Sequence, residues 1–86
     1  MSHERILLYP LATEKTVKMI ERENKLVFVV STKSSTKDIT REFEELFNVK
    51  VDRVNTIRRS DGRRVAFIKL TKEYKASDIS AKLRIL

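Results

Sequence analysis

Cysteine is absent from this chain of 86 residues, and glycine, proline and histidine each occur only once. Without cysteine, disulfides and thiolate metal sites are excluded, which suits a reducing cytoplasm. One glycine excludes a glycine-rich phosphate loop, and His3 lacks the partners of a Ser-His-Asp or Cys-His catalytic device. No apolar run approaches the ~20 residues of a membrane span, and residues 1–10 are too short and acidic for a signal peptide. We therefore expect no enzyme, cofactor, metal, small-molecule substrate or membrane insertion.

Positive charge, by contrast, is abundant and unevenly distributed. Lys and Arg number 19 against 12 acidic residues, with a net charge of +7 and a pI near 10.0. Residues 49–72 contain eight basic and two acidic residues, so most of the net charge lies there. A basic segment on a near-neutral body indicates a polyanionic partner, most simply a nucleic acid.

This basic segment has the pattern of a β-hairpin. Asp61-Gly62 lies between two apolar runs, and glycine tolerates the positive φ of tight turns. The tip, RRSDGRR, carries Arg58, Arg59, Arg63 and Arg64. Pairing across the turn predicts one face with the cross-strand pairs Val54–Ile68 and Thr56–Ala66. The other face then carries the pairs Arg53–Lys69, Asn55–Phe67 and Ile57–Val65.

The first half of the chain predicts an edge strand, a helix and a central strand. Residues 6–8 form the edge strand, which Pro10 ends. Thr13 is the expected N-cap of a helix reaching about residue 23, with Val17 and Ile20 on its buried side. Residues 25–31 form the clearest strand, and residues 26–30 within it are apolar without alternation, so this strand is central and buried on both faces.

Two further helices follow from capping and periodicity. Ser35 and Asp38 resemble a capping box, and Asn48 is expected to end that helix in a left-handed conformation. Its apolar stripe is Ile39, Phe43, Leu46 and Phe47. Ser77 is the expected cap of a C-terminal helix whose stripe is Ile79, Leu83 and Leu86.

The element order predicts a split β-α-β unit, in which the last strand lies between two parallel ones and antiparallel to both. We expect a single RNA-binding domain over residues 1–86. Its fold class is α+β, a small sandwich with a mixed, mainly antiparallel sheet, a C-terminal hairpin and helices on both faces.

Three other functions receive less support. Acyl-phosphate hydrolases are small sandwiches that need an arginine-bearing loop near the N-terminus, and here Arg5 stands alone. Glu42, Glu44 and Glu45 are expected to form a solvated helix face rather than a metal site. RNA-recognition modules stack bases on several strand aromatics. The segment RRVAFIKL offers only Phe67, which is expected to pack under a helix, so the chain should grip structured RNA by phosphate and shape.

Four segments resemble a known family. They are PLATEK (10–15), Asn24-Lys25-Leu26, Val54-Asn55-Thr56 and the strand over residues 63–70. Together, in this order, they resemble the large-subunit ribosomal protein twenty-three family over essentially the whole chain. Val65 stands where the family pattern has a second basic residue. The short hairpin tip and the lack of a long basic N-terminal extension resemble an archaeal member.

The resemblance implies a structural component of the large ribosomal subunit in the cytoplasm, bound to large-subunit ribosomal RNA near the exit of the polypeptide tunnel. It implies neighbouring ribosomal proteins, among them protein twenty-nine, and docking of signal recognition particle and the translocon. By matched position it makes Glu14 a docking residue and assigns RNA contacts to Thr13, Lys15, Lys25, Asn55 and Thr56.

Charge alone adds further candidate RNA contacts: Lys33, Lys37, Arg53, Arg58, Arg59, Arg63, Arg64 and Lys69. The four tip arginines are the strongest candidates, because their positive charges repel one another unless an anion neutralises them. One alternative stays open. A free-standing regulatory protein that binds RNA or DNA fits the same basic hairpin.

Overall fold

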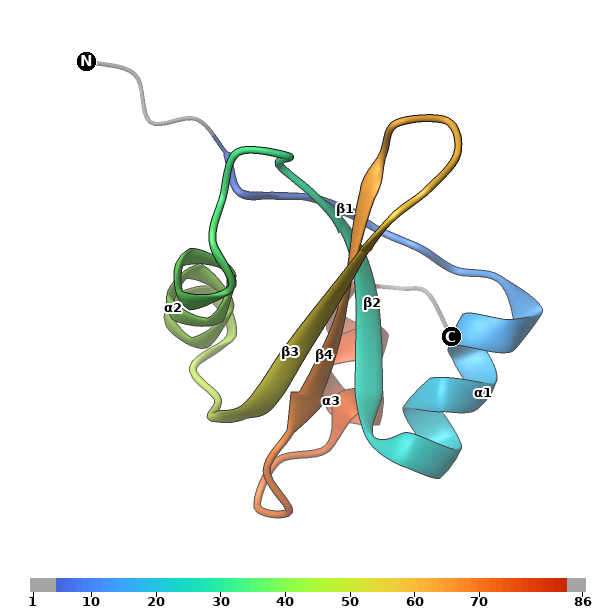
Figure 1. The fold of residues 1–86 in the computed structure, drawn as a ribbon. Helices are drawn as coiled ribbons and strands as arrows, with labels where there is room; N and C mark the ends of the chain where they lie inside the picture. The colour runs from blue at the N-terminus through green and yellow to red at the C-terminus, as the bar shows by residue number, and fades with distance from the viewer. Residues whose placement is uncertain (1–4, 84–86) are drawn as a thin grey trace.

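Four strands and three helices follow one another in the computed structural model, which describes residues 5–83 (Figure 1). In chain order they are β1 (Leu7–Pro10), α1 (Glu14–Glu23), β2 (Lys25–Val30), α2 (Thr36–Phe47), β3 (Val51–Arg58), β4 (Arg64–Leu70) and α3 (Ala76–Leu83). This order confirms the α+β class predicted from the sequence.

The sheet has the strand order β1-β2-β4-β3. β4 lies between β2 and β3 and is antiparallel to both, which confirms the predicted split β-α-β unit. The hairpin register is also the predicted one, with Val54 opposite Ile68 and Asn55 opposite Phe67. The sheet is not mixed, however. β1 pairs antiparallel with β2, so every hydrogen-bonded pair of strands in the described residues is antiparallel.

One face of the sheet, here called the helix face, carries the main core. Its strand residues include Leu26, Phe28, Ala66, Ile68 and Leu70, all nearly or fully buried. Residues of α2 and α3 cover them: Ile39, Phe43, Ala76 and Ile79. Residues alternate between the two faces along β2 and β4. The even-numbered apolar side chains of these strands are therefore buried under α2 and α3.

The opposite face, here called the open face, has a smaller apolar cluster of Val27, Val29 and Val65. Among the hydrophobic residues of the range 5–83, those that pack on it from outside the sheet are Leu11, from the β1–α1 connection, and Met19, from α1. α1 itself lies beside β2 (Figure 1) and also sends Ile20 into the main core. On the open face, α1 covers the part of the sheet beside β2, so the prediction of helices on both faces is confirmed for that part. Ile57 on β3 remains 52% exposed.

The predicted boundaries of α1 and α2 are confirmed by their caps. The Thr13 hydroxyl accepts a hydrogen bond from the N–H of Thr16, and Ser35 accepts one from Asp38, each within a reciprocal capping box. Asn24 and Asn48 end α1 and α2 with φ of 55° and 54°. Asparagine is the residue most tolerant of this conformation after glycine, so the two helices stop where the sequence directs.

Three local predictions were wrong. Pro10 is the last residue of β1 rather than the stop before it, which an edge strand tolerates. Leu46 is 63% exposed, because α2 turns only Ile39 and Phe43 fully into the core. On α1, Thr16 and Ile20 are buried whereas Val17 is only half-buried.

The C-terminal helix also begins differently from the prediction. α3 starts at Ala76, so Ser77 lies inside its first turn, and Leu86 is outside the described residues. The N–H of Ala76 donates to the Asn24 side-chain oxygen at 2.7 Å. The Asn24 amide nitrogen donates to the carbonyls of Leu70, Thr71 and Tyr74 at 3.4, 3.4 and 2.9 Å. The cap of α3 is therefore supplied by the end of α1.

Candidate nucleic-acid interface

Three rows of side chains cross the open face. The first row is Lys25, Lys69 and Arg53; the second is Val27, Phe67 and Asn55; the third is Val29, Val65 and Ile57. Each row runs across β2, β4 and β3, so residues far apart in sequence become neighbours. The result is an apolar strip with a basic row at one end and the arginine-rich hairpin tip at the other.

The basic row is only weakly neutralised. Lys25 lies 3.3 Å from the Glu23 carboxylate, and Arg53 lies 3.9 Å from that of Asp52. Lys69 forms no salt bridge within residues 5–83. Exposed pairs such as Arg53–Asp52 contribute little free energy, so this row can exchange its local acids for phosphate oxygens.

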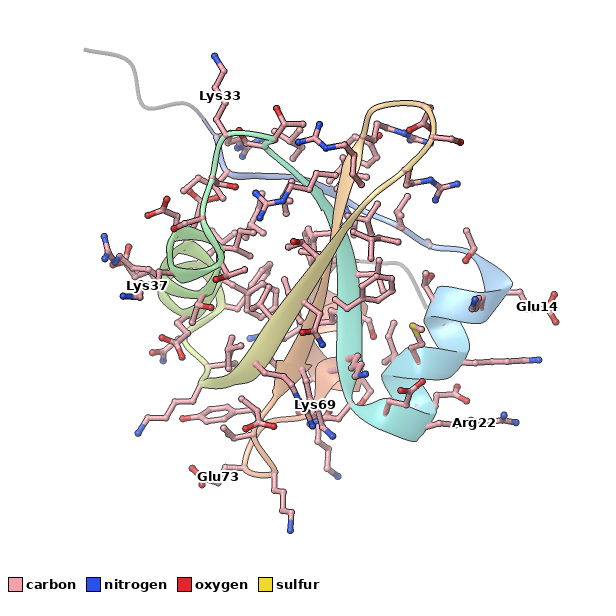
Figure 2. The ribbon with its side chains drawn as sticks, in the orientation of Figure 1. Glu14, Arg22, Lys33, Lys37, Lys69 and Glu73 are labelled. Atoms are coloured by element: carbon pink, nitrogen blue, oxygen red, sulfur yellow. The ribbon has the colours of Figure 1, made fainter. Side chains whose placement is uncertain are left out.

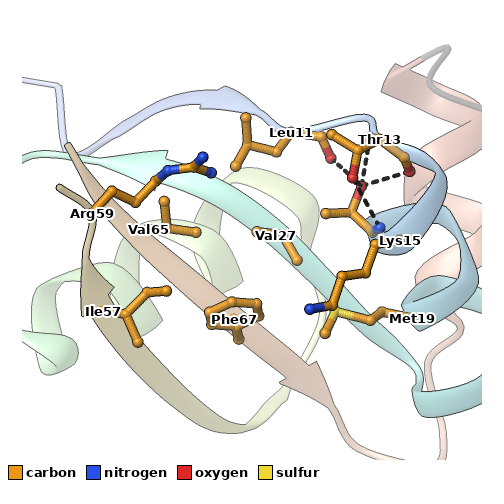
Figure 3. Close-up of a pocket in the computed structure, with 10 residues that line it drawn as sticks. Leu11, Thr13, Lys15, Met19, Val27, Ile57, Arg59, Val65 and Phe67 are labelled. Carbon is orange, nitrogen blue, oxygen red and sulfur yellow. Dashed lines mark hydrogen bonds between the residues drawn. The ribbon is translucent and has the colours of Figure 1, made fainter. Parts of the chain in front are cut away.

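The first turn of α1 borders the same face. The Thr16 hydroxyl donates to the carbonyl of Leu11 at 2.8 Å and so fixes the β1–α1 connection against the helix. This geometry directs Lys15 toward the sheet (Figure 3). Glu14 projects away from the sheet (Figure 2), is 89% exposed, and lies 3.7 Å from Lys18 on its own helix. Adjacent residues of the motif thus face opposite directions.

A pocket of about 220 Å³ opens between α1 and the open face (Figure 3). Val27, Val65 and Phe67 come from the strands beneath it. Lys15 and Met19 line the side formed by α1, and Ile57 of β3 and Arg59 of the hairpin tip line the opposite side. Phe67 is half-buried in this pocket, which Met19 of α1 also lines, so the prediction that it packs under a helix is confirmed only in part.

The hairpin tip does not present its four arginines equally. The Arg63 guanidinium donates to the Asp61 carboxylate at 3.0 and 2.9 Å and to the Tyr9 hydroxyl at 2.9 Å. These hydrogen bonds hold the pKa of Asp61 below its usual value and raise the pKa of Arg63. The charge of Arg63 is therefore already neutralised by the Asp61 carboxylate, whereas Arg58 and Arg59 form no salt bridge within residues 5–83.

Arg64 lies on the helix face and joins the loop after β2 to strand β3. Its guanidinium donates to the carbonyls of Ser31 and Ser34, and to the Thr56 hydroxyl at 3.3 Å. Both Arg64 and Thr56 are half-buried. These contacts give the pair a structural role that their charge and sequence position do not reveal.

The remaining predicted contacts are scattered. Lys33 lies in the loop after β2, and Lys37 lies in the first turn of α2 on the far side of the molecule from α1 (Figure 2). The structure therefore brings together Lys15, Lys25, Arg53, Asn55, Arg59 and Lys69, with Thr13 as the cap beside them. It does not place Lys33, Lys37, Thr56, Arg58 or Arg64 on that face, since Arg58 pairs with Arg64 across the hairpin.

Two of the three glutamates expected on a solvated face have structural partners instead. Glu42 accepts a hydrogen bond from the N–H of Leu7 at 2.8 Å, and Glu44 accepts one from Val51 at 2.9 Å. They fasten α2 to the first residues of β1 and β3. Among the described residues, no group of three or more acidic or histidine side chains could hold a metal ion.

The pocket was not predicted from the sequence, although the predicted hairpin register already placed two of its apolar residues on one face. Alternation along β3 and β4 already placed Ile57 and Phe67 on the same face as Arg53 and Lys69. An apolar and aromatic strip beside basic residues on one sheet face is a pattern of nucleic-acid surfaces. The position of α1, which forms the second side of the pocket, could not be read from strand alternation.

Comparison with known proteins assigns the chain to a family. The family model described as ribosomal protein L23 matches residues 5–80. A large ribosomal subunit protein uL23 from Methanothermobacter thermautotrophicus is 49% identical over 80 residues, covering 93% of each chain. None of the described helices is long and apolar enough to cross a membrane. The chain therefore belongs to the ribosomal protein L23 family, as an archaeal-type member with a structural role in the large ribosomal subunit.

Proposed function

We propose that the open face is the surface by which this protein binds large-subunit ribosomal RNA. The observation that carries the proposal is the cross-strand row of Lys25, Lys69 and Arg53, continuous with Asn55 and bordered by Lys15 and Arg59. Phosphate contacts from such a row supply affinity and fix orientation on the RNA. Arg59 extends the surface into the hairpin tip, which projects beyond the helices (Figure 1).

In this proposal the residues 1–86 act as one non-catalytic RNA-binding domain near the exit of the polypeptide tunnel. Thr13 contributes by capping the helix that presents Lys15. The far-side lysines, Lys33 and Lys37, are secondary contacts at most. Membership of a ribosomal protein family gives no support to the alternative of a free-standing regulatory RNA or DNA binder.

Paired substitutions test the surface. Arg53→Ala with Lys69→Ala removes two cations from the open face, and Lys33→Ala with Lys37→Ala removes two from the other side. Binding to large-subunit ribosomal RNA is measured from 50 to 400 mM salt, a range of about eightfold chosen to define the slope. The open-face double variant should flatten the log–log salt slope by about 1.4–1.8, since each lost phosphate contact removes roughly 0.7–0.9.

The control double variant should leave the slope nearly unchanged. Both pairs are on the surface, so thermal unfolding of both variants should match the parent protein. If the control pair flattened the slope and the open-face pair did not, the RNA would lie on the other side of the molecule and the proposal would fail.

We further propose that Glu14 belongs to a docking surface for exit-site factors, namely signal recognition particle and the translocon, with ribosomal protein twenty-nine as a neighbour. The support is geometric: Glu14 is exposed and points away from the face assigned to RNA (Figure 2). A basic partner could therefore reach it in the assembled subunit.

Ribosomes carrying Glu14→Lys separate docking from a local helix role. Charge reversal at a contact should weaken binding of signal recognition particle or translocon several-fold, whereas the loss of helix-dipole stabilisation costs only about 0.3–1 kcal/mol. Glu21→Lys, on an exposed position of the same helix, is the control. Normal binding of both factors to Glu14→Lys ribosomes would rule out the docking role.

A further inference from the structure

The pocket between α1 and the open face has a composition that RNA backbone binding does not need. A surface that only tracks phosphates is polar, yet this pocket is built on Val27, Val65 and Phe67 and walled by Met19 and Ile57. Ile57 is 52% exposed and Phe67 is half-buried, so apolar area is left open to solvent at this point. Leaving it uncovered in the assembled particle is unfavourable.

Charge complementarity identifies what covers it. Lys15 and Arg59 extend along the two sides of the pocket (Figure 3), and neither forms a salt bridge within residues 5–83. An apolar side chain of another protein would fill the interior but would desolvate both cations without an anion. A nucleotide offers both parts at once, since its base has a flat apolar face and its two flanking phosphates are negative.

We propose that this pocket receives one unpaired nucleobase of the ribosomal RNA, extruded from its helix and stacked against Phe67. Lys15 and Arg59 bind the phosphates on either side of that nucleotide. The proposal rests on the open face being the RNA surface, and it goes further by naming a base-specific subsite within it. It also changes the expectation that the chain grips RNA only by phosphate and shape.

A volume of about 220 Å³ accommodates a single base and not a stack of several. Phe67 is the one aromatic residue of the pocket, so one stacking interaction is available. The ligand is therefore an isolated bulged or loop nucleotide beside a structured RNA helix, which the basic row of Lys25, Lys69 and Arg53 holds by its phosphates.

The test compares Phe67→Leu with Phe47→Leu on large-subunit ribosomal RNA transcribed from Methanothermobacter thermautotrophicus. Phe67→Leu keeps an apolar side chain at this position but removes the aromatic face. Phe47→Leu makes the same change in α2, on the helix face, where Phe47 packs 4.7 Å from the Phe43 ring centre. Base stacking on an aromatic ring supports a loss of affinity of about 5- to 30-fold for Phe67→Leu.

The salt slope should stay unchanged in Phe67→Leu, because no phosphate contact is lost. Phe47→Leu should bind like the parent protein. Irradiation of the parent complex at a wavelength absorbed by nucleobases should attach a nucleotide to the tryptic peptide of residues 65–69, which contains Phe67. This second measurement needs no variant, so it decides the matter even if Phe67→Leu folds poorly.

Several results would overturn the subsite. They are parental affinity in Phe67→Leu, a flattened salt slope in that variant, a nucleotide adduct found only on other peptides, and an adduct of peptide 65–69 with another ribosomal protein in intact subunits. Failure of the wider function looks different, since the parent protein would then show no salt-dependent binding to the RNA. The two proposals can therefore fail separately.

Discussion

The helix face and the open face of the sheet are formed by alternate residues of the same strands, yet they differ in nearly every property. The helix face buries Phe28, Ala66 and Ile68 under α2 and α3, and it holds the protein together. The open face carries the basic row beside an apolar strip on which Leu11 and Met19, from the β1–α1 connection and α1, pack along one side. Period-two alternation lets the same strands form the core on one side and the proposed RNA surface on the other.

The largest expected effect is on the helix face. Phe43 is fully buried and its ring packs edge-on against Phe28 at a centroid distance of 5.7 Å. Phe43→Ala should therefore lower the free energy of unfolding by about 3–5 kcal/mol, measured by urea denaturation. Phe67→Ala on the open face should cost less than half as much. Equal losses would show that the two faces do not divide their roles in this way.

The next effect separates two arginines of the tip. Arg64 donates to carbonyls of the loop after β2, so Arg64→Ala should lower the free energy of unfolding by about 1–3 kcal/mol. Arg58 is exposed at the end of β3, and Arg58→Ala should stay within about 0.5 kcal/mol of the parent protein. Denaturation curves measure both. A destabilised Arg58→Ala beside an unaffected Arg64→Ala would contradict the assignment.

The smallest effect concerns the charge balance of the tip. Asp61→Asn keeps the side-chain oxygen that accepts from the Arg63 N–H at 3.0 Å, but it removes the charge that occupies the Arg63 guanidinium. If Arg63 then reaches a phosphate, the salt slope of RNA binding should steepen by roughly 0.7–0.9. Asp78→Asn, on the exposed side of α3, is the matched control and should leave the slope as it is.

The elements that could be predicted from the sequence are those that depend on local physics. The N-caps at Thr13 and Ser35, the left-handed stop at Asn48 and the hairpin register are all decided within a few residues. The alternation of residues between the two faces of the sheet along β3 and β4 likewise placed Arg53 and Lys69 on one face. Family resemblance added the ribosomal role, which no local pattern could supply.

What could not be predicted depends on contacts between distant segments. Arg64 reads as one more basic residue of the tip until the loop 31–34 is placed beside it. Glu42 reads as a solvated acid until β1 lies against α2. Leu46 fits a helical stripe that is wider than the surface available to cover it. For Arg64 and Glu42 the partner is more than twenty residues away in the sequence. For Leu46 the sequence pattern leaves open the position of the elements that could cover it.

The side chain of Asn24 has a consequence for the kinetics of folding. Its hydrogen bonds to Leu70, Tyr74 and Ala76 join segments separated by 46 to 52 residues. Contacts that close such long loops form only after their entropy cost has been met, which favours formation late in folding. The junction of α1 with α3 should therefore be absent from the transition state, so weakening it accelerates unfolding and leaves the folding rate nearly constant. The side-chain amide of Asn24 therefore sets how long α3 stays docked against the end of α1 before the native protein unfolds.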